Sequence, residues 1–228
     1  MNKPITVIIP AFNEEKAIAN VIAEVPMDLV GEVIVVDNNS TDQTAMVANR
    51  SGATVLQETR KGYGYACLKG IDHIRGGSHT EFVAFLDGDY SDYPKELVKL
   101  HQAAVSQNLD LIIGSRVLGH REKGSLTPQQ IFGNWLATRL IARLYGVKYT
   151  DLGPFRLIRW EALESLQMED KTYGWTVEMQ LKAAKMGLKI GEIPVNYRKR
   201  IGTSKVSGTF KGTVLAGYKI LSWIFKYL

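Results

Sequence analysis

The 228-residue sequence predicts an α/β fold with a single, mostly parallel central sheet flanked by helices. Five short apolar runs alternate with helical patterns of roughly ten to fifteen residues, which is typical of βαβ units. Polar residues follow each run, at the strand ends where open α/β sheets bind ligands. The composition, 45% hydrophobic and 22% charged, is that of an ordinary globular protein.

The expected strands and helices follow one another along the chain. The apolar runs predict strands at 5–10, 32–37, 53–57, 82–86 and 109–114, with further strand-like segments at 155–159 and 189–197. Helical patterns are expected at 15–24, 40–50, 128–145 and 175–187, and two further helices begin near Gly64 and near Lys95. Ser40 or Thr41 is a possible N-cap of the second helix, and Thr127 followed by Pro128 is typical of the start of the fifth.

The helix expected at 128–145 has two possible roles. Its predicted apolar face contains Ile131, Trp135, Leu136, Leu140 and Leu144. We expect this face to pack on the edge of the sheet. A membrane-facing helix, or one that forms a homodimer, is the alternative.

The turn Asp87-Gly88-Asp89 directly follows the buried-type strand 82–86. Two carboxylates this close repel each other, and a divalent cation relieves the repulsion. Hard oxygen ligands on a tight turn suit Mg²⁺ or Mn²⁺, with open positions left for a substrate's phosphates. The alternative is an acidic turn that ends the strand and caps the helix near Lys95.

Basic residues are concentrated at the C-terminal end. Seven of the 28 Lys and Arg residues lie after Glu192, and no acidic residue does, so the remainder of the chain is slightly acidic. The segment 198–205 combines cations, hydroxyl groups and glycine, which bind phosphate oxygens well. A solvated cationic loop is the alternative. Nucleic-acid binding is disfavoured because the basic stretch is short and runs into an apolar tail.

We expect residues 1–208 to form a catalytic domain and residues 209–228 an amphipathic C-terminal helix at a membrane surface. Trp223 and Tyr227 belong to residue types favoured at membrane interfaces, and Lys219 and Lys226 can reach anionic head groups. The apolar stretch is shorter than the ~20 residues that cross a bilayer. A helix that completes the core, or one that makes an oligomer contact, is the alternative.

Six motifs, in order along the chain, carry a resemblance. They are Ile8-Ile-Pro-Ala-Phe-Asn-Glu14, Val35-Val-Asp-Asn-Asn-Ser-Thr-Asp42, Arg60-Lys-Gly62, Asp87-Gly-Asp89, Gly114-Ser-Arg116 and Arg198 through Lys205. With them the chain resembles the family-2 glycosyltransferases of the GT-A fold, and among these the polyprenyl-phosphate (dolichyl-phosphate) mannose and glucose synthases. The resemblance spans roughly residues 5 to 205.

The resemblance implies a metal-dependent, inverting transfer of a hexose from GDP-mannose or UDP-glucose to a polyprenyl phosphate. It assigns nucleotide-sugar binding to Pro10, Phe12, Glu14, Asp37, Asn38, Arg60 and Asp87. Asp87 and Asp89 would bind the donor's Mg²⁺ or Mn²⁺. Some mannose synthases carry a Gln two positions after the second Asp; here Ser91 is at that position with Asp92 beside it, so either could be a third ligand.

The resemblance also implies an acceptor site. It assigns catalytic roles to Asp87, Asp89, Arg116 and Arg200, and acceptor-phosphate binding to Arg200, Ser204 and Lys205. A phosphate acceptor is already anionic near neutral pH and needs no strong base. Glu178 is a reserve carboxylate in the region where other branches of the fold use an acid, although a place on a helix face is the simpler interpretation.

Other functions fit the sequence less well. A dinucleotide-dependent oxidoreductase needs a Gly-rich turn after the first strand, and Pro10-Ala-Phe-Asn-Glu14 has no glycine. A nucleotidyltransferase would carry a Gly-rich, Lys-containing loop there. A family-2 enzyme with a non-lipid or saccharide acceptor, and an inactive sugar-nucleotide-binding module, remain alternatives. The lone Cys67 excludes a disulfide framework. Since Met1-Asn-Lys-Pro4 lacks a signal-peptide pattern, we expect a cytoplasmic protein, peripheral at the cytosolic face of the membrane.

Overall fold

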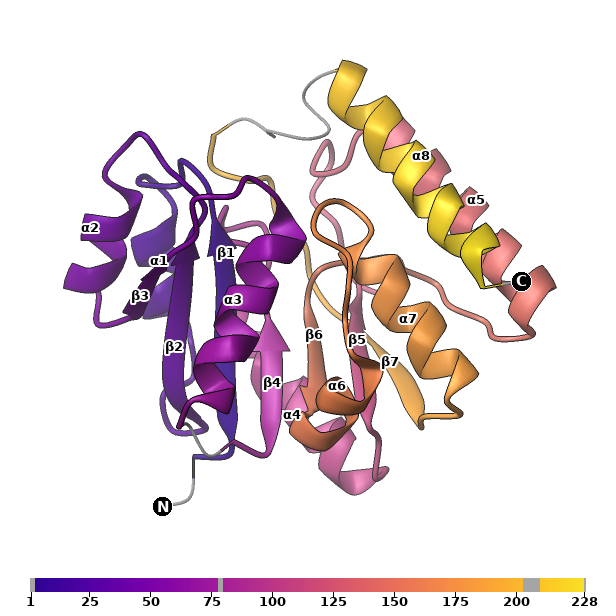
Figure 1. The fold of residues 1–228 in the computed structure, drawn as a ribbon, viewed down its shortest axis with the longest axis horizontal. Helices are drawn as coiled ribbons and strands as arrows, with labels where there is room; N and C mark the ends of the chain where they lie inside the picture. Colours follow the sequence, from indigo (N-terminus) through magenta and orange to yellow (C-terminus); the bar gives the residue numbers. More distant parts are fainter. Residues whose placement is uncertain (1–2, 78–79, 203–209, 228) are drawn as a thin grey trace.

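A seven-stranded sheet, in the order β3-β2-β1-β4-β6-β5-β7, forms the centre of the protein (Figure 1). The structure, a computed structural model, describes residues 3–77, 80–202 and 210–227. The strands are β1 (Ile5–Ala11), β2 (Val30–Asp37), β3 (Thr54–Gln57), β4 (Phe82–Phe85), β5 (Leu111–Ser115), β6 (Arg156–Arg159) and β7 (Ile190–Pro194). All pairs are parallel except those of β6 with β4 and β5. The predicted fold class, a mostly parallel sheet flanked by helices, is confirmed.

The antiparallel strand β6 changes which loops reach the carboxyl edge of the sheet. Arg156 opens β6 and pairs with Phe85 near the end of β4 and with Ile113 in β5. Because β6 runs against its neighbours, the segment that precedes it lies beside the segments that follow β4 and β5. Residues 151–155 therefore join the strand-end loops, a position that the apolar pattern of 155–159 did not indicate.

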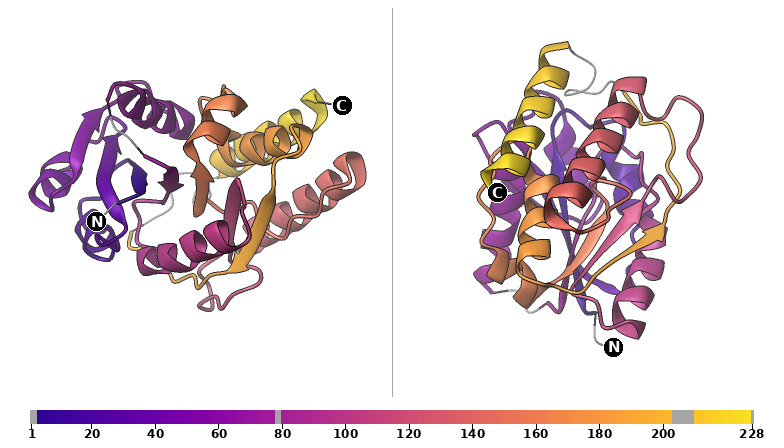
Figure 2. Two further views of the ribbon diagram at one scale, coloured as in Figure 1. Left: turned by 90° about the horizontal axis from the view of Figure 1, so that it is seen from below. Right: turned by 90° about the vertical axis from the view of Figure 1, so that its right-hand side faces the viewer.

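Helices cover both faces of the sheet (Figures 1 and 2). Side chains alternate along each strand, so Val7 and Val33 face one core and Ile8 and Ile34 the other. The first core includes α1 (Ile18–Ala23), α2 (Thr44–Arg50) and α4 (Leu97–Ser106), which follows the short 3₁₀ turn η1 (Pro94–Glu96). The second includes α3 (Tyr63–Arg75), α5 (Pro128–Tyr145), α6 (Trp160–Leu166), α7 (Trp175–Lys185) and α8 (Phe210–Lys226).

The helix starts differ in how well the sequence predicted them. Thr127 and Gln130 form a complete capping box at the start of α5, with Pro128 at the first helical position, as predicted. The N-cap predicted at Ser40 or Thr41 is wrong, because α2 begins only at Thr44, whose backbone N–H donates to Asp42 Oδ1 at 3.0 Å. The hydroxyl oxygen of Ser40 instead accepts a hydrogen bond from the backbone N–H of Asn13, 2.9 Å away. Helix α6 was not predicted from the sequence.

The buried face of α5 is only partly the predicted one. Ala137, Thr138 and Ile141 are buried, whereas Ile131 and Trp135 are 46% and 51% exposed. The later turns of α5 pack against the core through Ala137 and Ile141, whereas its first turns leave large apolar side chains exposed. The expectation that Ile131 and Trp135 lie on the packed face is therefore wrong.

Helix α8 packs against α5 and α7 (Figure 2). Trp223 and Ile224 are buried, and the Trp223 indole N–H donates to Asp170 Oδ2 at 2.6 Å. The hydroxyl of Tyr145 in α5 donates to the carbonyl of Ile224. One face of α8 is thus part of the folded body, so Trp223 is unavailable to a membrane. Among the described residues, no helix is both long and apolar enough to span a bilayer.

Candidate active site

A cavity of about 810 Å³ opens at the carboxyl ends of β1, β2 and β4. Most of the sequence-predicted site residues line it together: Pro10, Phe12, Glu14, Asn38, Asp87, Asp89, Arg116 and Arg200. They come from five separate segments of the chain, which follow parallel strands and therefore meet at one edge of the sheet. Asp37 and Arg60 are not part of this lining.

The carboxylate pair follows the end of β4. The Oδ1 atom of Asp87 is buried and lacks a hydrogen-bond partner within the described chain. Burial and the neighbouring Asp89 carboxylate raise the pKa of Asp87 to about 6. Asp89 Oδ1 accepts from the backbone N–H of Ser91 at 2.9 Å and from its hydroxyl at 2.5 Å. An unpartnered oxygen beside a second carboxylate is a donor set that suits Mg²⁺ or Mn²⁺.

The neighbours of this pair do not complete a metal cage. Asp92 is buried, neither of its carboxylate oxygens has a described partner, and burial together with Asp87 and Asp89 raises its pKa well above the ordinary value. Within residues 3–77, 80–202 and 210–227, no group of three or more His, Cys, Asp or Glu side chains is arranged to hold a metal. The Ser91 hydroxyl already donates to Asp89. The residues therefore fit a cation held by two carboxylates and completed by substrate oxygens.

Arg200 reaches the carboxylate pair from the far end of the chain. Its Nη2 forms an ion pair with Asp89 Oδ2 and lies 3.9 Å from Glu14 Oε1. The backbone N–H of Ile201 donates to the Asp89 carbonyl at 2.9 Å, which holds this segment against the turn. The other two residues predicted to bind the acceptor phosphate, Ser204 and Lys205, lie outside the described residues.

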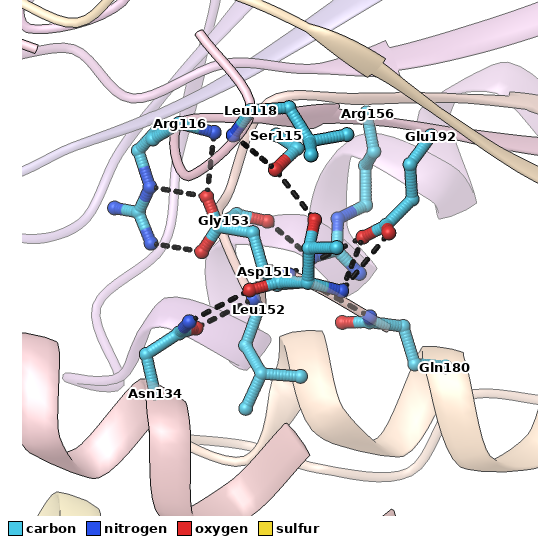
Figure 3. Close-up of polar contacts among 11 residues, drawn as sticks. Ser115, Arg116, Leu118, Asn134, Asp151, Leu152, Gly153, Arg156, Gln180 and Glu192 are labelled. Carbon is cyan, nitrogen blue, oxygen red and sulfur yellow. Dashed lines mark hydrogen bonds and ion pairs between the residues drawn. The ribbon is translucent and has the colours of Figure 1, made fainter. Parts of the chain in front are cut away.

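Arg116, just beyond β5, is held by Asp151 in the loop before β6 (Figure 3). Asp151 accepts from Nε and Nη2 of Arg116 at 2.8 and 2.7 Å, and from its backbone N–H at 2.8 Å. Burial by itself lowers the pKa of Arg116, but the Asp151 carboxylate outweighs it and raises that pKa. Arg116 also lies over the Tyr197 ring, 5.0 Å from its centroid. A permanent cation is thus fixed in the cavity wall.

Two helices and one strand brace the loop that carries Asp151 (Figure 3). Asn134 of α5 donates to the carbonyl of Thr150 and accepts from the N–H of Leu152, both at 2.9 Å. Gln180 of α7 donates to the carbonyl of Asp151 at 3.1 Å. Glu192 of β7 accepts from the N–H groups of residues 150 and 151. The position of Arg116 therefore depends on residues that sequence motifs did not single out.

On the opposite side, Asn38 connects two strand-end loops. Its side chain donates to the carbonyl of Arg60 at 2.7 Å and accepts from the N–H of Gly62 at 2.8 Å. This brings Lys61 into the cavity wall, 5.1 Å from the centroid of the Phe12 ring. Sequence reasoning missed Lys61, although it lies inside the quoted Arg60-Lys-Gly62 motif.

Asp37 and Arg60 occupy other positions. Asp37 is buried, and its Oδ1 accepts from the N–H of Ser40 at 3.3 Å. The Arg60 side chain is 65% exposed, pairs with Glu58 at 2.7 Å and lies over the Tyr65 ring. Their assignment to the nucleotide site stays a prediction.

The far half of the cavity is apolar. Phe132, Gly133, Leu136 and Ala137 of α5 form one wall, and Ala216, Gly217, Ile220 and Leu221 of α8 form the other. This half is continuous with the carboxylate pair and Arg200, because one cavity contains both sets of residues. The arrangement can accommodate a molecule with an anionic head and an apolar tail.

Glu178, the reserve carboxylate, has a structural role in the described chain. It is fully buried, accepts from the N–H groups of Glu169 and Asp170 at 2.8 Å, and pairs with Lys182 at 2.8 Å. These contacts fix the loop before α7 and agree with the simpler of the two interpretations.

Comparison with known proteins identifies relatives over most of the chain. The sequence profile of glycosyl transferase family 2 matches residues 6–167. An uncharacterised glycosyltransferase of Mycobacterium tuberculosis is 36% identical over 93% of this chain and 94% of its own. The undecaprenyl-phosphate mannosyltransferase of Micrococcus luteus is 31% identical over 90% of this chain and 88% of its own. The dolichyl-phosphate hexose transferase of Haloferax volcanii is 29% identical over 95% of this chain and 92% of its own.

The fold has been seen before in solved structures. Glucosyl-3-phosphoglycerate synthase from Mycobacterium tuberculosis, in complex with Mn²⁺, UDP and phosphoglyceric acid, superposes with a TM-score of 0.77. The match covers 99% of this chain and 78% of that one at 23% sequence identity. At this identity the likeness establishes the GT-A fold.

Proposed function

Because this chain belongs to glycosyl transferase family 2, we propose that it transfers a hexose from a nucleotide sugar to a polyprenyl phosphate. The observation that carries the proposal is the single cavity in which a carboxylate pair and two arginines adjoin an apolar compartment. A nucleotide sugar needs only the polar half. An acceptor with an isoprenoid tail would use both.

The donor would bind along the ends of β1 and β2. Pro10, Phe12, Glu14 and Asn38 line this part of the cavity. Asp37 ends β2 directly before Asn38, and Arg60 lies in the segment after β3, where its carbonyl accepts from the Asn38 side chain. The cation of Lys61 beside Phe12 is suited to the donor's phosphates. GDP-mannose and UDP-glucose are the candidate donors.

Asp87 and Asp89 would hold Mg²⁺ or Mn²⁺, which would neutralise charge on the departing nucleoside diphosphate. Their fit rests on the unpartnered Oδ1 of Asp87 and on the second carboxylate beside it. Asp89 now pairs with Arg200, so this guanidinium would move toward the acceptor phosphate when the carboxylates take up the donor complex.

The transfer is a single displacement that inverts the anomeric centre. An oxygen of the acceptor phosphate forms a bond to the anomeric carbon, while the bond to the nucleoside diphosphate breaks and its electron pair leaves with the diphosphate. Arg116 and Arg200 supply positive charge near the reacting phosphates. A phosphate monoester has a second pKa of about 6 and is therefore already anionic at neutral pH, so no side chain has to remove a proton.

An assay with purified protein tests this proposal. Undecaprenyl phosphate in detergent would be incubated with GDP-mannose or UDP-glucose, each with Mg²⁺ or Mn²⁺. The readout is the amount of sugar that is recovered with the lipid in the organic phase. We expect metal-dependent transfer with one donor. 3-Phosphoglycerate is the comparison acceptor, because the fold relative was solved with phosphoglyceric acid. Transfer to that acceptor alone would favour the alternative of a non-lipid acceptor.

The exposed apolar residues of α5 and α8 support the proposal that the protein acts at a membrane surface. Ile131, Phe132 and Trp135 on α5, and Leu215, Tyr218 and Phe225 on α8, are between 43% and 71% exposed. Such a surface on neighbouring helices suits the membrane that would contain the acceptor. Flotation with anionic vesicles should recover the protein, and Phe132→Ser with Trp135→Ser should reduce recovery. A homodimer through α5 would instead show in sedimentation without vesicles.

A further inference from the structure

Each helical wall of the apolar compartment contains a glycine that faces the cavity. On α5, Gln130, Gly133 and Ala137 follow at three- and four-residue spacing, and on α8 Gly217 is followed at the same spacing by Ile220 and Leu221. Residues with this spacing lie on one side of a helix, so both glycines belong to the cavity-facing stripes.

Glycine is unfavourable at both positions for the helix itself. Gly133 and Gly217 lie away from the helix ends, where glycine is among the residues least compatible with helical structure. Neither has a positive φ, so the backbone conformation does not require glycine.

Packing does not require glycine at these positions either. A Cβ built on Gly133 or Gly217 would meet nothing within 4 Å. Gly70 of α3 is different, because its Cβ would lie 2.8 Å from the Ile8 side chain, which would have to shift to admit even a methyl group. What Gly133 and Gly217 provide is therefore the empty space beside them.

That space leads to the reaction centre. The same cavity contains Asp87 and Arg200, and Leu136 and Ile220 supply apolar surface next to the glycines. A methyl-branched polyprenyl chain is wider than a straight hydrocarbon chain and needs this additional room.

We infer that Gly133 and Gly217 determine acceptor specificity by keeping the compartment wide enough for the branched tail of a polyprenyl phosphate. The inference rests on the proposed function. It makes two independent statements: filling the space impairs transfer to a long acceptor, and the glycines do not contribute to folding.

The test replaces each glycine with alanine and with leucine. Transfer to undecaprenyl phosphate is compared with transfer to geranyl phosphate, which has a tail too short to extend along both helices. We expect Gly133→Leu and Gly217→Leu to lower kcat/KM for the long acceptor by about tenfold or more, the effect of a blocked apolar pocket. Transfer to the short acceptor and nucleotide affinity should change less than about twofold. The alanine variants should melt at or above the wild-type temperature.

Tyr218→Leu is the matched control, because it places a leucine next to Gly217 at a side chain that is 71% exposed and outside the cavity lining, and because leucine keeps this position of the exposed α8 surface apolar. Its long-to-short ratio should equal that of the wild type. An unchanged ratio in both glycine-to-leucine variants, an equal loss with both acceptors, or a lowered melting temperature in the alanine variants would overturn the inference. Wild-type protein that transfers to neither polyprenyl phosphate would instead refute the proposed function.

Discussion

The two halves of the cavity are built in different ways. In the donor half, backbone-directed hydrogen bonds fix the strand-end loops, as when Asn38 bonds to both Arg60 and Gly62. In the proposed acceptor half, α5 and α8 form the walls, and the large apolar side chain of Phe132 in one of them is 60% exposed. The first half is anchored in the sheet, and the second depends on how two helices dock.

This difference separates the effects that mutations should have. Changes in the donor half should affect nucleotide and metal binding with little effect on the fold. Changes at the anchors of α8 should affect stability and transfer to a lipid acceptor while nucleotide binding persists. The following predictions test that separation, from the largest expected effect to the smallest.

Asp89→Asn should reduce transfer at least about 100-fold, because it removes the charge that pairs with Arg200 and that would face the proposed metal. The asparagine oxygen can still accept the hydrogen bonds from Ser91, so the turn should keep its shape. Kinetics and metal-dependent nucleotide binding by calorimetry measure the loss, with circular dichroism as the folding control. Wild-type transfer in this variant would remove the carboxylate pair from the mechanism.

Trp223→Ala should lower the free energy of unfolding by about 3–5 kcal/mol, because it deletes a buried indole and its hydrogen bond to Asp170. Phe225→Ala, two residues away and 54% exposed, should change it by less than about 0.5 kcal/mol. Urea denaturation measures both, and nucleotide binding by the folded protein should persist in both. Equal effects would mean that α8 does not dock through Trp223.

Asp87 should make donor binding depend on pH. Its pKa of about 6 is raised by burial and by Asp89, so protonation below about pH 6 should weaken metal-dependent nucleotide binding. Between its ordinary pKa of 3.8 and about 6, the folded state binds more protons at this site than the unfolded state. The stability contributed by this carboxyl therefore falls as pH rises through that window.

Asp87→Asn tests the stability part of this prediction. Asparagine does not titrate, so the variant should lack the fall in stability that Asp87 causes between pH 4 and pH 7. The urea midpoint of the variant minus that of the wild type should therefore be larger at pH 7 than at pH 4. A pH-independent difference between the two proteins would show that Asp87 does not titrate in this range.

Lys61→Ala should weaken nucleotide affinity by a few-fold. A hydrogen bond to a charged group contributes about 1.5–3 kcal/mol, and exposure to water lowers that contribution. Arg60→Ala should change it less, because Arg60 pairs with Glu58 and lies outside the cavity lining. Calorimetric titration with UDP and GDP compares the two variants. A larger loss in Arg60→Ala would support the sequence-based assignment of Arg60 to the nucleotide.

The sequence by itself determined the local features. The alternation of apolar runs predicted strands β1 to β5, because a buried strand must be apolar along its own length. The residues after β1 and β4, from Phe12 and Glu14 to Asp87 and Asp89, could be assigned to one edge because parallel strands end together. Thr127 and Pro128 marked the start of α5 because a helix cap forms within a few residues.

The tertiary structure decided which distant segments meet. The direction of β6 brings Asp151 to Arg116, and apolar periodicity carries no information about strand direction. Arg200 meets Asp89, and Trp223 enters the core beside Asp170, through pairings between segments far apart in the chain. Periodicity shows which side of α5 or α8 is apolar, but not which neighbour covers it. The apolar compartment and its two glycines follow from that docking, because their open space exists only between two helices that the sequence does not pair.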